Sequence, residues 1–140
     1  MPSTFSTAFR VSWIETDAAQ IVHFSYYFRF FERTEEELYR HLGFTFNDVM
    51  KKHNIFLPRV DAFCQFKKPA RFNDLLEVEM CVEEIKEKSI RYGFKIFNKE
   101  SAVLLANGYI TVVAMDKHTE KAVKMPHKIT EKLKPFAVKF

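Results

Sequence analysis

Glycine, proline and cysteine are scarce in this sequence, which has three glycines, five prolines and two cysteines among 140 residues. With 47% hydrophobic residues beside so few glycines and prolines, a disordered or low-complexity chain is excluded and a packed core is indicated. The length suits one domain and leaves no room for a second. We therefore expect a single domain over residues 1–140.

Paired cysteines and long apolar runs are also lacking. Cys64 and Cys81 are far apart and outside any paired metal-ligand spacing, so neither a disulfide framework nor a metal site is expected. Residues 1–10 lack the basic and apolar segments of a secretory signal. No apolar run approaches the roughly 20 residues that a membrane-spanning helix needs. These absences predict a cytoplasmic protein without a membrane span.

Charge of one sign is not concentrated anywhere along the chain. The 22 basic and 18 acidic residues leave a net charge of +4, and the two signs are interspersed. A nucleic-acid-binding protein of this size usually carries a denser basic stripe. Nucleic-acid binding is therefore not expected, and the small positive excess favours an anionic ligand only weakly.

Aromatic residues, in contrast, are abundant, and 16 of them are phenylalanines. Such residues can fill a core, line an apolar ligand tunnel or cover a subunit interface. Composition does not separate these uses, although core filling is the commonest.

The predicted elements follow the order strand, long helix and then about four strands. Residues 5–14 alternate as a strand does, and apolar residues at steps of three and four predict an amphipathic helix between Ser25 and Gly43 as its caps. Within the last strand, Gly108 indicates a bulge or a close backbone approach. The remaining elements are a short helix over 47–52, extended segments over 55–68, 76–83, 90–96 and 102–115, and a closing helix over 127–133. This order predicts an α+β fold with one long helix against a curled antiparallel sheet of about five strands.

The loop between the first strand and the long helix carries a candidate catalytic carboxylate, Asp17. The first backbone N–H groups of the helix lack internal partners, so they can stabilise a carbonyl oxygen that gains negative charge. A nearby carboxylate can attack that carbonyl or deprotonate a water, which suits thioester hydrolysis. On spacing alone, an ordinary turn residue is the commoner role for Asp17, and a half-buried histidine at the helix entrance is the commoner role for His23.

Three blocks of sequence occur in a particular order: TDAAQIVHFSYYFRFFERTEEELYRHLG, then PRVDAFCQFKKPARFNDLLEVEMCVEEIKEKSI, then ANGYITVVAMD followed by KMP. Together they resemble the 4-hydroxybenzoyl-CoA thioesterase-like branch of the hot-dog superfamily. The resemblance runs from Phe9 to Leu133 and covers nearly the whole chain. It implies a hot-dog fold and the hydrolysis of an acyl-CoA thioester to a free acid and CoA.

The resemblance also implies roles around the loop. The family's catalytic aspartate falls on Asp17, as nucleophile or general base, and its carbonyl-polarising backbone N–H falls on Phe24, with the N–H of Ser25 adjacent. Some members have a histidine at the Phe24 position, whereas here His23 stands one place earlier and is a weaker candidate. Many members have glycine where this chain has Gln20, so we expect a difference in the loop or the acyl pocket that affects substrate preference first.

Substrate contacts are expected from basic and aromatic side chains. In the family, basic residues at a turn between two strands hold the CoA phosphates, and two positions of that turn are lysines here. Another basic cluster precedes the strand over 76–83, and a solvated surface residue is the alternative role of each lysine. The residues expected to contact the substrate are Tyr27, Phe31, Lys68, Arg71, Lys86 and Lys88.

The resemblance further implies a homodimer or homotetramer that needs no cofactor, since CoA is part of the substrate. Two other functions stay open. One is a thioesterase that acts on an acyl group attached to a carrier protein. The other is a non-catalytic acyl-CoA-binding module, against which the presence of Asp17 argues.

Overall fold

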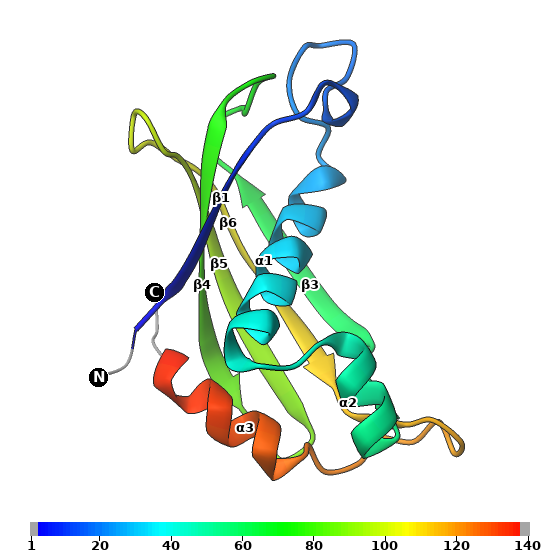
Figure 1. Cartoon of the computed structure of the whole chain (residues 1–140). Helices are drawn as coiled ribbons and strands as arrows, with labels where there is room; N and C mark the ends of the chain where they lie inside the picture. Colours follow the sequence, from blue (N-terminus) through cyan, green and yellow to red (C-terminus); the bar gives the residue numbers. More distant parts are fainter. Residues whose placement is uncertain (1–2, 138–140) are drawn as a thin grey trace.

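A computed structural model describes residues 3–137 and shows one long helix, α1 (Tyr26–Leu42), against one face of a curled antiparallel sheet (Figure 1). The sheet has five strands in the order β1-β4-β5-β6-β3. Their bounds are β1 (Phe5–Arg10), β3 (Arg59–Phe66), β4 (Leu75–Ile85), β5 (Ser89–Asn98) and β6 (Leu104–Val113). The predicted α+β architecture is therefore confirmed.

Helix α1 forms because its apolar and polar residues separate onto two faces. Phe30, Phe31 and Leu38 are fully buried, whereas the basic residues of the opposite face are exposed. The helix ends as predicted at Gly43, whose φ of 93° is a left-handed conformation that glycine adopts without strain. Ser25 occupies the N-cap position, but its side chain makes no cap hydrogen bond.

Shorter elements close the fold. Helix α2 (Phe46–His53) begins at a capping box formed by Thr45 and Asp48, and β2 (Ile55–Phe56) pairs with β7 (Met115–Asp116). Helix α3 (His127–Leu133) has the predicted bounds and leads into the short turn η2 (Lys134–Phe136). The segment predicted as extended over residues 55–68 is divided into β2 and β3.

The first strand is shorter than predicted. It ends at Arg10, and the turn η1 (Trp13–Glu15) follows because Ser12 and Glu15 form a capping box. As a result, Trp13 is 73% exposed, whereas Val11 is buried. The turn starts the loop that leads to Asp17.

The core lies between α1 and the facing side of the sheet. Val78, Tyr92 and Phe94 have no exposed surface, and the Phe31 ring stacks on the Phe94 ring with centroids 4.4 Å apart. At Gly108 of β6, a Cβ atom would lie 2.1 Å from the carbonyl oxygen of Phe63 on β3. Gly108 thus marks a close backbone approach, one of its two predicted roles.

Candidate active site

Residues 16–25 form a compact loop between η1 and α1. The N–H of Asp17 donates to the carbonyl of Ile21 over 3.0 Å, and the N–H of Gln20 donates to the carbonyl of Asp17 over 2.9 Å. The N–H of Val22 donates to the carbonyl of Ala70 over 2.8 Å, which fastens the loop to the segment after β3. These backbone bonds hold the predicted catalytic residue in one position.

Gln20 adopts a left-handed backbone conformation within this loop, with φ at 66°. This is the conformation that a glycine would adopt most easily. The loop therefore retains a glycine-type backbone although a glutamine occupies the position, and its side chain is exposed.

The Asp17 carboxylate is half-buried and partly oriented by its own turn. Its Oδ1 accepts a hydrogen bond from the N–H of Ala19 over 2.8 Å. Its Oδ2 has no hydrogen-bond or ion-pair partner among residues 3–137. One carboxylate oxygen is thus free to contact a substrate or a water.

The backbone N–H groups at the start of α1 differ in availability. The N–H of Ser25 points to Nδ1 of His23 over 3.4 Å, and the Ser25 hydroxyl lies 2.8 Å from the same nitrogen. The Nδ1 atom of His23 thus contacts both the backbone N–H and the hydroxyl of Ser25. Within the described chain, the N–H of Phe24 donates no hydrogen bond. Phe24 therefore carries the amide that a carbonyl oxygen could accept from.

A hollow of about 460 Å³ lies between this loop, the start of α1 and the end of β3. A small-molecule site typically measures about 300–1,000 Å³, so the hollow can hold part of an acyl group. The structure brings together four of the predicted residues here, namely Asp17, Phe24, Tyr27 and Lys68. Apolar lining comes from Ile21, Val22, Phe66 and Pro69.

Tyr27 forms an aromatic wall of the hollow. Its ring meets that of Phe66 edge to face, with centroids 4.9 Å apart. Burial raises the pKa of the Tyr27 phenol, and a backbone hydrogen bond with Ala70 opposes part of that rise. The phenol therefore stays neutral at physiological pH.

The two cysteines of the chain do not offer a reactive thiolate. Burial raises the pKa of the thiols of Cys64 and Cys81 to about 12, so neither forms a thiolate near neutral pH. Between residues 3 and 137, no three His, Cys, Asp or Glu side chains are grouped as a metal site requires. The same range contains no helix long and apolar enough to cross a membrane.

The other predicted substrate residues do not line the hollow. Phe31 lies one turn further along α1 and is fully buried. The backbone of Arg71 forms a β-bridge with Ile21, and Arg71 is exposed. Lys86 and Lys88 lie in the hairpin between β4 and β5, at the opposite end of the sheet (Figure 1). The 11 residues of β4 place this hairpin roughly 35 Å from the loop.

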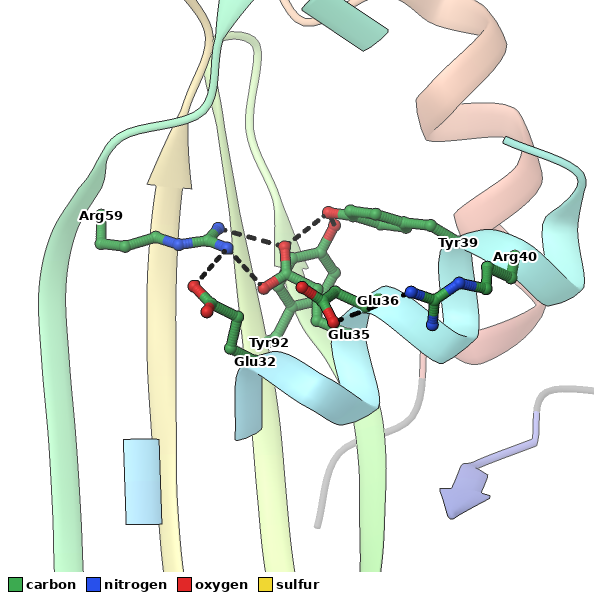
Figure 2. A network of polar contacts seen from close by, with 7 residues as sticks. All are labelled: Glu32, Glu35, Glu36, Tyr39, Arg40, Arg59 and Tyr92. Carbon is green, nitrogen blue, oxygen red and sulfur yellow. Dashed lines mark hydrogen bonds and ion pairs between the residues drawn. The ribbon is translucent and has the colours of Figure 1, made fainter. Parts of the chain in front are cut away.

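A buried polar network in the C-terminal half of α1 was not predicted (Figure 2). The Glu35 carboxylate has no exposed surface and accepts two hydrogen bonds from the Arg59 guanidinium, over 2.8 and 3.1 Å. It also accepts a bond from the Tyr39 hydroxyl over 2.8 Å, and the Tyr92 hydroxyl lies 2.6 Å from that of Tyr39. The signal was in the helical spacing, since residue 35 follows buried Phe31 by four positions.

Residues 11–133 match the thioesterase-like superfamily. The chain belongs to this superfamily. The prediction made from the three sequence blocks is confirmed at the level of the family.

Relatives within the superfamily are similar over nearly the whole chain. A protein of Aquifex aeolicus, provisionally named an esterase, is 35% identical over 125 residues, which are 89% of this chain and 94% of that protein. The Escherichia coli acyl-CoA thioester hydrolase YbgC is 29% identical over 125 residues, which are 89% of this chain and 92% of that protein. The crystal structure of a 1,4-dihydroxy-2-naphthoyl-CoA thioesterase from Synechocystis superimposes with a TM-score of 0.88 at 22% identity, covering 94% of this chain and 96% of that one. These likenesses confirm the hot-dog thioesterase fold.

Proposed function

We propose that this protein hydrolyses acyl-CoA thioesters, with Asp17 as nucleophile or general base. The observation that carries the proposal is that the free Oδ2 of Asp17 and the unpaired N–H of Phe24 belong to residues that line one hollow. Membership of the thioesterase-like superfamily and the name of the E. coli relative support the same reaction.

The proposed mechanism divides the work between a side chain and a backbone group. The thioester carbonyl oxygen accepts a hydrogen bond from the N–H of Phe24, and the positive end of the α1 dipole favours the charge that develops on it. Asp17 either attacks the carbonyl carbon or removes a proton from an attacking water. In the general-base case, the water oxygen adds to the carbon, the carbon–sulfur bond breaks, and the CoA thiolate leaves and takes up the proton held by Asp17. In the nucleophile case, the carbon–sulfur bond breaks to leave an anhydride between the acyl group and Asp17, and water then hydrolyses this anhydride to release the acid and restore the carboxylate. No cofactor is required.

The substitution Asp17→Asn tests this assignment. Asparagine keeps an oxygen that can accept from the Ala19 N–H, so the loop retains its turn while the carboxylate is lost. We expect kcat on acyl-CoA to fall on the order of 10²–10⁴-fold, with an unchanged melting temperature. Asp74→Asn is the matched control, because Asp74 also accepts a backbone bond within a turn, from Arg71 over 2.8 Å. Wild-type turnover by Asp17→Asn would disprove the assigned role.

The positions of the basic residues support a site made from two chains. Lys86 and Lys88 lie at the opposite end of the sheet from Asp17, and β3 is an edge strand whose Val60, Phe63 and Phe66 are 59%, 47% and 48% exposed. Antiparallel pairing of β3 with β3 of a second copy would place the hairpin of one chain near the Asp17 loop of the other. We therefore propose a homodimer in which the hairpin lysines of the partner bind the CoA phosphates. A further pairing into a homotetramer remains a prediction.

Carrier-linked substrates and a non-catalytic module are the two other candidate functions. A panel of acyl-CoA and acyl-carrier thioesters distinguishes the first, because a carrier-specific enzyme would leave free acyl-CoA intact. Isothermal titration distinguishes the second, since tight CoA binding without turnover of any thioester would identify a binding module. We expect the protein to hydrolyse acyl-CoA, which would argue against both alternatives.

A further inference from the structure

A second hollow lies at the opposite end of α1 from Asp17, between α2, α3 and the turn after α1. It has a volume of about 580 Å³ and lies next to Gly43, the residue at which α1 ends. The 17 residues of α1 separate the two hollows by roughly 25 Å. This groove is therefore distinct from the site proposed for thioester hydrolysis.

The floor of the groove is apolar. Val49 of α2 and Ile129 of α3 are only 2% and 4% exposed, and both line the groove together with Phe44. The Phe44 ring packs on Tyr39 with centroids 5.0 Å apart, which fixes its orientation. Such a floor favours a ligand with an apolar body.

The rim of the groove is positively charged. Lys52, His53 and Lys128 border it and make no ion pair or hydrogen bond with their side chains within residues 3–137. The acids of the rim are already engaged. Asp48 accepts from the N–H of Thr45 over 2.9 Å.

Glu131, the other acid, is contacted by a histidine of its own helix and by a lysine of the turn that follows. Its carboxylate lies 2.7 Å from Nζ of Lys134 and 3.3 Å from Nε2 of His127. Lys132 donates to the carbonyl of Leu42 over 3.0 Å, which compensates the end of α1. The cations of the rim left without an ion pair among residues 3–137 are Lys52 and Lys128.

We propose that this groove binds an amphipathic anion, specifically a carboxylic acid with an apolar tail. The tail would lie on Val49 and Ile129, and the carboxylate would lie between Lys52 and Lys128. An inorganic phosphate would leave the apolar floor unused, whereas a neutral lipid would leave the cations unpaired. Binding here does not depend on the proposed hydrolysis, but an acid of this class is what that hydrolysis would release.

Titration calorimetry of dodecanoate into the full chain tests the proposal, in an Asp17→Asn background that holds any turnover constant. We expect Lys52→Glu/Lys128→Glu to weaken dodecanoate binding at least tenfold. Lys121→Glu/Lys124→Glu is the matched control, since it makes the same charge change at two exposed lysines outside the groove, and should stay within twofold of the parent. Both pairs should retain the parent melting temperature.

Three outcomes would overturn the proposal. Equal affinity in the groove variant and its control would place the acid elsewhere, such as in the hollow beside Asp17. Binding of inorganic phosphate that disappears with Lys52 and Lys128 would make the groove a phosphate site. Equal affinity for dodecanol and dodecanoate would remove the role of charge. None of these readouts requires an active enzyme, so failure here and failure of the proposed function are distinguishable.

Discussion

At the scale of single residues, Gln20 is the position where the loop tolerates a side chain in a conformation that most side chains avoid, with φ at 66°. Gln20→Gly removes that strain, but glycine also gains freedom in the unfolded chain. We therefore expect its free energy of unfolding to stay within about 0.5 kcal/mol of wild type. Gln20→Val should lose about 1–2 kcal/mol, because a β-branched residue fits a positive φ poorly. Urea unfolding measures the stability of both variants. A Gln20→Val variant as stable as wild type would contradict the left-handed conformation.

Asp17 and the N–H of Phe24 act at this same scale, and their proposed roles depend on a loop held by backbone bonds. The activity of Gln20→Gly then reports on substrate preference. If the loop backbone is unchanged, turnover should persist, while the removal of the exposed side chain alters which acyl groups are accepted.

At the scale of elements, Glu35 and Arg59 join α1 to the edge strand β3 through buried charges (Figure 2). Glu35→Ala would leave the Arg59 guanidinium with only the more distant Glu32 carboxylate at 3.6 Å and the buried Tyr39 hydroxyl without its acceptor, so we expect a loss of about 2–4 kcal/mol in unfolding free energy. Glu36→Ala is the control, because Glu36 makes only a surface ion pair with Arg40 at 3.9 Å, and should change stability by about 0.5 kcal/mol or less. Equal losses in the two variants would contradict a stabilising role for the contact between Glu35 and Arg59.

The same carboxylate predicts a pH dependence. Burial raises the pKa of Glu35, and the attraction of Arg59 offsets this only in part. The folded pKa then lies above the unfolded value, so the stability from protonated Glu35 is complete below the unfolded pKa and is lost as pH rises through the folded pKa. Wild type should therefore lose stability relative to Glu35→Gln as the pH rises above 4.5, the ordinary pKa of a glutamate, and urea unfolding at a series of pH values measures this loss.

Strands β3 and β6 approach each other closely at Gly108, where a Cβ atom would lie 2.1 Å from a backbone oxygen. Gly108→Ala can be accommodated only if the two strands separate, so we expect a loss of about 3 kcal/mol or more. At Gly93, the nearest atom to an added Cβ belongs to the Glu83 side chain, at 2.7 Å, and a side chain can move. Gly93→Ala should lose less than half as much. Thermal unfolding of both variants measures the difference.

At the scale of the whole molecule, the proposed homodimer predicts that two inactive variants restore each other. Asp17→Asn and Lys86→Glu/Lys88→Glu should each be weak alone at low acyl-CoA. When they are unfolded and refolded together, mixed dimers would contain one site with an intact Asp17 and intact partner lysines. Random pairing then returns about a quarter of the wild-type sites. Absence of recovery, with mixed dimers shown by mass spectrometry, would place each site within one chain.

The order of elements, the bounds of α3, the end of α1 at Gly43 and the candidate role of Asp17 followed from the sequence alone. Periodicity and glycine are local signals that report on residues a few positions apart, whereas the candidate role of Asp17 depended on a family pattern that spans nearly the whole chain. The first strand was drawn too long because alternation continues past Arg10, whereas the Ser12 and Glu15 capping box turns the chain.

Only the tertiary structure decided which distant residues meet. The burial of Glu35 was not predicted from the helical spacing, and nothing in the sequence indicated that Arg59 from the edge strand would bind it. Strand length and direction carry Lys86 and Lys88 to the end of the sheet opposite Asp17, which favours a second chain. The groove between α2 and α3 likewise joins residues almost 80 positions apart. Neighbouring residues determine turns, caps and helical faces, whereas a site forms only where packing brings remote segments together.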